Sequence, residues 1–156
     1  MPAEKIKKFL DEHGVKYVTV HHSPAVTAQE IAAAAHIPGR QVAKTVIVKV
    51  DGKTAMAVLP ADRVVNFDVL REEVFAGDAR LATEEEFEQL FPECEVGAMP
   101  PFGNLYGMDV YVDQSLAEDQ HIAFNAGNHR ELIQMSYADY QRLVQPTVCA
   151  FATGRD

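Results

Sequence analysis

The hydrophobic pattern of the chain is clearest between residues 42 and 60. The stretches VAKTVIVKV (42–50) and KTAMAVLP (53–60) are short and rich in apolar and β-branched residues, as expected for β-strands. The pair Asp51-Gly52 lies between them, and such a pair is typical of a two-residue type I′ turn. The pattern therefore predicts a β-hairpin.

Lys44 lies near the start of the first of these strands. Side chains two residues apart share a face of a strand, so Lys44 points the same way as Val46, Val48 and Val50, and we expect this face to be buried. A lysine on a buried face is costly unless its ammonium group reaches water or an anion. Two interpretations follow: a lysine at the margin of the sheet whose end is solvated, and a fixed cation beside a pocket for a carboxyl ester or a phosphate.

Helical spacing and capping signals predict the helices. Thr27 and Thr83 each precede a glutamate by three residues, which is the arrangement of a capping box, and Ser136 is placed to cap the helix that follows it. Short apolar stretches between turn-forming residues predict further strands. The predicted helices cover residues 2–13, 27–37, 64–77, 84–91 and 137–144, and the further strands cover 17–23, 108–113, 121–126, 131–136 and 146–151.

These elements combine hairpins with crossover connections instead of a regular alternation of strands and helices. Such a mixture predicts an α/β or α+β domain, built on a curved, mostly mixed β-sheet or partial barrel that helices flank. A chain of 156 residues can bury a sizeable core, and no stretch of it has the composition of a linker. We therefore expect a single domain over residues 1–156.

Composition narrows the classes of function. The net charge of −9 disfavours a large nucleic-acid interface and a DNA partner, whereas contact with the end of one nucleic acid needs only one or two well-placed cations. No apolar run approaches the roughly 18 residues of a membrane span, so we expect a cytoplasmic protein without a membrane partner. The six histidines and two cysteines show no metal-ligand spacing, and we expect no metal site.

Two loops have a composition suited to ligand binding. The stretch EVGAMPPFGNLYG (95–107) is rich in glycine and proline, and NAGN (125–128) follows a predicted strand. Glycine lets backbone N–H groups approach a ligand closely, and proline stiffens the loop that carries them. On composition alone, two ordinary turns remain the alternative.

At these residues the sequence resembles the YbaK family, the bacterial editing domain that is associated with prolyl-tRNA synthetase. The resemblance covers roughly residues 20–150. It rests on the lysine that opens the strand AKTVIV, here Lys44, and on the G-x-x-x-P loop of the family, here GAMPP with Gly97 and Pro101. The Phe-Gly pair after this loop and the later segment NAGNHRELIQMS are also similar to the family.

The resemblance implies a free-standing aminoacyl-tRNA deacylase, a hydrolase that cleaves the ester of mischarged tRNA in trans. It implies that Lys44 anchors the 3′ end of tRNA and that Gly97, with neighbouring backbone donors, faces the ester carbonyl, so these two are the candidate catalytic residues. It implies neither a metal nor an organic cofactor. The candidate substrate-binding residues are Met99, Pro101, Phe102, Asn125, Gly127 and His129.

The implied substrates are small amino acids, because an editing pocket excludes larger side chains by steric clash. The alanine-specific part of the family carries a histidine near the position of Asn125, and this chain departs from that pattern, so cysteine, serine, threonine and non-protein amino acids remain open. An aminoacyl-tRNA synthetase is a candidate partner besides the 3′ end of aminoacyl-tRNA. Two alternatives also remain: a non-catalytic module that binds an aminoacyl group or docks on a synthetase, and an esterase unrelated to tRNA.

Overall fold

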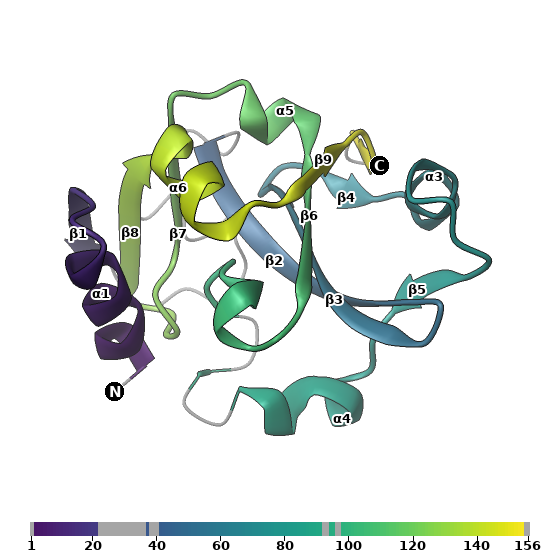
Figure 1. Ribbon diagram of the computed structural model, residues 1–156, viewed down its shortest axis with the longest axis horizontal. Coiled ribbons are helices and arrows are strands. Elements are labelled where there is room, and N and C mark those ends of the chain that lie inside the picture. Colours follow the sequence, from purple (N-terminus) through teal and green to yellow (C-terminus); the bar gives the residue numbers. More distant parts are fainter. Residues whose placement is uncertain (1, 22–36, 38–40, 92–93, 96–97, 155–156) are drawn as a thin grey trace.

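The computed structural model describes residues 2–21, 37, 41–91, 94–95 and 98–154 (Figure 1). Its helices are α1 (Pro2–Glu12), α3 (Phe67–Glu73), α4 (Glu84–Phe87), α5 (Gln114–Ala117) and α6 (Tyr137–Val144), with short 3₁₀ turns η2 (Glu88–Leu90) and η3 (Gly103–Leu105). Its strands are β1 (Tyr17–His21), β2 (Val42–Val50), β3 (Lys53–Pro60), β4 (Val64–Val65), β5 (Ala79–Leu81), β6 (Asp109–Asp113), β7 (His121–Asn125), β8 (Glu131–Ser136), β9 (Thr147–Cys149) and β10 (Ala152–Thr153).

A mixed sheet of eight strands lies at the centre of the described chain. Its order is β1-β8-β7-β2-β3-β6-β9, and β5 adds to β2. The hairpins β2–β3 and β7–β8 are antiparallel, whereas β2–β7, β3–β6 and β6–β9 are parallel. Figure 1 shows β2 and β3 running diagonally to β7 and β6, so the sheet is strongly twisted. The predicted mixed, curved sheet flanked by helices is confirmed.

The hairpin predicted from Asp51-Gly52 is present. Strands β2 and β3 pair along their whole length. The φ angles of Asp51 and Gly52 are 49° and 81°, and two consecutive residues with positive φ define a type I′ turn. The local turn chemistry therefore sets the register of the longest hairpin in the described chain.

The central strands are buried on both faces. In β2, Ala43 and Ile47 point into one apolar core, and Val48 and Val50 point into another. We call the face with Ala43 and Ile47 the front face and the opposite one the back face. The expectation of a buried face around Val46, Val48 and Val50 is confirmed, and the other face of the strand is buried as well.

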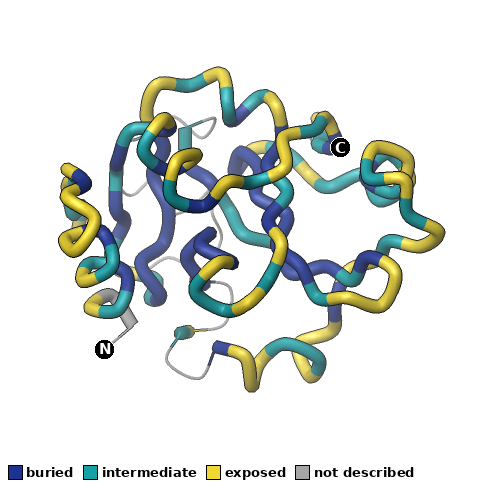
Figure 2. The backbone as a smooth tube through the Cα atoms, viewed as in Figure 1, coloured by how far each residue is buried: buried dark blue, intermediate teal, exposed yellow. Residues whose placement is uncertain are grey.

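Helices cover each face with their apolar sides. On the front face, Ile6 and Leu10 of α1 and Tyr140 of α6 are fully buried in the larger core. On the back face, Leu70 of α3 packs with Phe151 against the alanines and valines of β2 and β3. Figure 2 shows the result, with buried residues along the central strands and exposed residues on the outer turns.

The single helix predicted over residues 64–77 is wrong at its start. Val64 and Val65 form the short strand β4, which pairs with β10, and the helix begins only after Asn66. The side chain of Asn66 accepts a hydrogen bond from Val69 N at 3.2 Å, as an N-cap residue does. Leu70 is the buried residue of α3, and Val65 and Val74 pack against the same back-face core. The cap and the β-branched pair before it outweigh the helical spacing.

Other elements differ at their ends. The predicted helix over 84–91 is α4 followed by the 3₁₀ turn η2, and the predicted strand over 146–151 is the shorter β9. The strand β5 and the helix α5 were not predicted, because each is shorter than the window in which a hydrophobic period can be recognised. The helix predicted over 27–37 lies outside the described residues except for Ile37. No helix in the described part of the chain is long and apolar enough to cross a membrane.

Candidate functional site

Lys44 is half-buried on the back face of β2. Its neighbours on that face belong to two separate apolar clusters, because Val42 packs with Ala61 and Leu132, whereas Val46 packs against the cluster of Val48 and Leu59. Lys44 therefore lies at the boundary between these clusters. This position agrees with the expectation that a cation interrupts an apolar face of the strand.

Asn125 at the end of β7 lies beside Lys44. The parallel pairing of β2 with β7 sets Val42 beside Ala123. Two residues further along both strands, Lys44 comes beside Asn125, on the same face as that pair. Neighbouring strands are about 4.8 Å apart, so these two polar side chains start from adjacent positions. Asn125 is only 8% exposed.

The two loops predicted to bind a ligand are in contact. The backbone N–H of Glu95 donates to the carbonyl of Gly127 at 2.8 Å, and the N–H of Ala98 donates to the carbonyl of Glu95 at 3.0 Å. The start of the glycine-proline loop is thus fastened to the loop after β7. Gly97, a candidate catalytic residue, lies outside the described residues.

The rest of the glycine-proline loop is held from the front face. The hydroxyl of Tyr140 donates to the carbonyl of Pro101 at 2.6 Å. Burial raises the pKa of Tyr140 well above its ordinary value, so this hydroxyl stays protonated and remains a donor. The ring of Phe102 is fully buried and contacts those of Phe124 and Tyr140, and Met99 belongs to the same core. Met99 and Phe102 thus support the loop from the side opposite Lys44.

The turn between β7 and β8 is built by its own backbone and by one asparagine. Gly127 has a φ of 101°, which favours glycine. The side-chain carbonyl of Asn128 accepts from Arg130 N at 2.8 Å and from Glu131 N at 2.9 Å. His129 is half-buried within this turn. The predicted residues Gly127 and His129 therefore lie in the ordered turn directly after Asn125.

An ion pair connects this turn to the N-terminal helix. Lys7 Nζ lies 2.9 Å from Glu131 Oε2. The hydrogen bond from Lys7 lowers the pKa of the Glu131 carboxyl, with a further contribution from Asn128, although partial burial opposes it. The sequence has no signal for this contact, because the two residues are far apart along the chain.

The described residues show no group of three or more His, Cys, Asp or Glu side chains that could hold a metal ion. Cys94, close to the glycine-proline loop, is half-buried, with its Sγ 3.8 Å from the hydroxyl of Tyr106. Burial raises the pKa of the Cys149 thiol to about 11, so this thiol is not an activated nucleophile.

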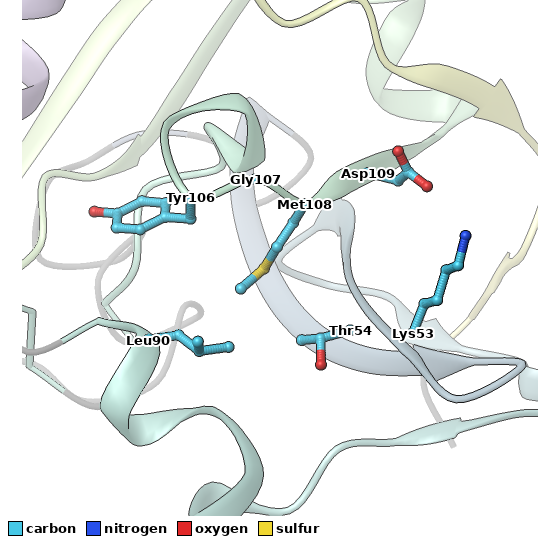
Figure 3. A pocket seen from close by; sticks show the side chains of 7 residues that line it. All are labelled: Lys53, Thr54, Leu90, Tyr106, Gly107, Met108 and Asp109. Atoms are coloured by element: carbon cyan, nitrogen blue, oxygen red, sulfur yellow. The ribbon is translucent and has the colours of Figure 1, made fainter.

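A surface hollow of about 530 Å³ lies elsewhere, between the start of β3 and the segment before β6 (Figure 3). Thr54 and Met108, which line it, continue the front-face alternation of β3 and β6, whereas Lys44 is on the back face near the other end of the hairpin. Figure 3 shows Met108 pointing into the space between Tyr106, Leu90 and Thr54. This hollow is therefore separate from the Lys44 site.

Comparison with known proteins gives one family and several relatives. A family model described as an aminoacyl-tRNA editing domain matches residues 22–143. The chain is 28% identical over 153 residues to the multifunctional Ser/Thr-tRNA deacylase ProXp-y of Escherichia coli strain K12, covering 95% of this chain and 91% of that protein. It is also 36% identical over 102 residues to a proline–tRNA ligase of Sulfurihydrogenibium sp., covering 64% of this chain and only 17% of the ligase.

Solved structures share the fold. The hypothetical protein APE2540 superposes with a TM-score of 0.85 at 22% identity, covering 96% of this chain and 99% of that one. A candidate trans-editing enzyme for prolyl-tRNA synthetase superposes with a TM-score of 0.81 at 22% identity, covering 98% of each chain.

Proposed function

Because the chain belongs to the aminoacyl-tRNA editing domain family, we propose that it is a free-standing deacylase that hydrolyses the ester of tRNA mischarged with a small amino acid. The observation that carries this proposal is the position of Lys44, a cation between two apolar clusters, beside Asn125 and the joined loops. The relative that matches nearly the whole chain is named as a Ser/Thr-tRNA deacylase, which supports the same reaction class. We treat residues 1–156 as one such domain.

The proposed reaction needs no protein nucleophile. Water attacks the carbonyl carbon of the ester, the bond to the ribose oxygen breaks, and the products are a free amino acid and a tRNA with its terminal hydroxyl restored. An aminoacyl ester is already activated, so orientation and polarisation of its carbonyl can supply the rate. We assign the anchoring of the tRNA 3′ end to Lys44 and the polarisation of the carbonyl to backbone donors at Gly97. No cofactor is required by this scheme.

The remaining candidate residues divide by position. Asn125, Gly127 and His129 are assigned to the substrate side, since they lie at the end of β7 or in the turn after it. Met99, Pro101 and Phe102 are assigned to shaping the site through the loop that they hold. The proposed partner is the 3′ end of aminoacyl-tRNA, met in the cytoplasm. The match to part of proline–tRNA ligases makes a synthetase a second proposed partner.

The test is hydrolysis of charged tRNA by the wild type and by Lys44→Ala. Purified protein is incubated with tRNAs that carry Ala, Ser, Thr, Cys or Pro, and loss of the ester is followed. We expect release from one or more of these, lowered about 10- to 100-fold by Lys44→Ala, because a hydrogen bond that involves a charged group contributes about 1.5–3 kcal/mol. Lys49→Ala is the matched control, because Lys49 is a half-buried lysine of the same strand near its other end.

Each alternative predicts a different result. Absence of hydrolysis for every charged tRNA would favour the non-catalytic binding module. Equal activity on simple aminoacyl esters and on charged tRNA would favour an esterase unrelated to tRNA. Full activity in Lys44→Ala would remove Lys44 from the mechanism.

A further inference from the structure

The side chain of Asn125 is buried with its carbonyl oxygen unused. Asn125 is 8% exposed, and no donor of the described residues lies within hydrogen-bonding distance of its Oδ1 atom, which is itself inaccessible. Two other asparagines show the ordinary situation. Asn66 Oδ1 accepts from Val69 N, and Asn128 Oδ1 accepts from two backbone N–H groups. A buried acceptor without a donor is costly, so the site at Asn125 suits a ligand that brings a donor.

The surroundings of Asn125 indicate which kind of donor fits. On the back face its neighbours are Ala123 on its own strand, Leu132 on β8 and Lys44 on β2. None of these carries a negative charge, and Lys44 carries a positive one. An ammonium group at this point would meet the like charge of Lys44. A neutral hydroxyl avoids this repulsion and needs only one acceptor.

We propose that Asn125 Oδ1 accepts a hydrogen bond from the side-chain hydroxyl of serine or threonine esterified to tRNA. This inference rests on the proposed deacylase function and names the residue that would select its substrates. A pocket that pairs a substrate hydroxyl rejects an analogue that lacks it, because the acceptor is then left unsatisfied. Asn125 is accordingly the specificity-determining residue for hydroxyl-bearing amino acids.

The test compares substrates of equal size. One tRNA is charged with threonine or with valine, which replaces the hydroxyl by a methyl group, and kcat/KM is measured with enzyme in excess. We expect the wild type to prefer threonine at least about 10-fold. Asn125→Leu, which keeps the size and removes the acceptor, should reduce this preference to about twofold or less by losing rate on threonine. Serine and alanine on the same tRNA form a second pair, with the same direction expected.

Two variants serve as controls. Asn128→Ala removes the neighbouring asparagine whose carbonyl is already satisfied, and it should leave the threonine-to-valine ratio unchanged even if it lowers stability. Lys44→Ala should lower both rates by a similar factor. Thermal unfolding shows whether Asn125→Leu is folded, and we expect its midpoint to be equal to or above that of the wild type, since an unsatisfied acceptor is removed. Asn125→Ala replaces it if the leucine does not fit.

The outcomes separate the two proposals. If the wild type hydrolyses none of the charged tRNAs, the deacylase function fails. If it hydrolyses them with no preference for the hydroxyl, or if Asn125→Leu retains the preference, the role of Asn125 is overturned while the deacylase stands. An equal loss on threonine and valine in Asn125→Leu also overturns it, because Asn125 would then pair with a group common to all substrates, such as a ribose hydroxyl.

Discussion

Asp113 is a buried carboxylate that organises the C-terminal end of the described chain. It is 4% exposed. Its Oδ1 accepts from Phe151 N at 2.9 Å and from Ala152 N at 2.8 Å, and its Oδ2 accepts from the hydroxyl and the backbone N–H of Ser115. Burial alone would raise the pKa of Asp113, but these four hydrogen bonds outweigh it and lower the pKa below its ordinary value. One side chain thus caps α5 and holds the segment that leads into β10.

We expect Asp113→Asn to destabilise the protein by about 2–3 kcal/mol. An amide has one oxygen instead of two, so it cannot accept all the hydrogen bonds from Ser115, Phe151 and Ala152. The pKa of Asp113 is lower in the folded than in the unfolded state. The stability that the Asp113 carboxylate contributes is therefore complete above its unfolded-state pKa of about 4, and it is lost as the pH falls through its folded-state pKa. Urea unfolding between about pH 3 and pH 7 measures both effects. The variant should lose less stability than the wild type on acidification; equal acid sensitivity would contradict the assignment.

Among the elements, the hairpin β2–β3 carries Lys44 and is fastened at its turn. The side chain of Asp51 accepts from Gly77 N and Asp78 N, both at 2.9 Å, and the backbone N–H of Asp51 donates to the carbonyl of Asp78 at 3.0 Å. The turn therefore also positions the loop before β5. A short range of sequence determines both the turn type and this connection.

We expect Gly52→Ala to destabilise the protein by about 1–2 kcal/mol, because Gly52 has a φ of 81° that an L-residue with a Cβ rarely adopts. No heavy atom of the described residues lies within 4 Å of the position of an added Cβ, so backbone strain and not a clash is the cause. Gly52→Asn is the control and should cost less, since asparagine tolerates this region. Chemical denaturation measures all three proteins, and an alanine variant as stable as the wild type would exclude strain at the turn.

Across the whole molecule, charge limits how the protein can hold tRNA. The net charge is −9. Glu84, Glu85 and Glu88 lie exposed around α4, and two described lysines, Lys7 and Lys8, are paired with acidic residues. A brief contact with the end of one tRNA fits this distribution better than an interface along its backbone.

We therefore expect a shallow salt dependence. The logarithm of kcat/KM for the best charged tRNA should fall with the logarithm of salt concentration with a slope of about −1 to −2, as for one or two phosphate contacts. Replacing Glu84, Glu85 and Glu88 together by lysine should raise kcat/KM at low salt and steepen the slope. A wild-type slope as steep as about −6 would show an extended tRNA interface instead.

Local features of the sequence determined many of the elements. The turn at Asp51-Gly52, the capping box at Thr83 and the cap at Ser136 were all predicted, because each depends on residues within a few positions of one another. Lys44 and the two loops could be chosen as site residues for the same reason. Where two local signals competed, as over residues 64–77, helical spacing alone gave the wrong start of the helix.

Tertiary structure alone decided which of these residues meet. Lys44 and Asn125 come together through the parallel register of β2 and β7, and the two loops through one backbone hydrogen bond between Glu95 and Gly127. Both contacts join segments far apart along the chain. Their register depends on how the two buried faces of the sheet pack, and no local propensity encodes that packing. The sequence by itself therefore supplied the candidate residues, and the packed sheet decided which of the described ones lie side by side.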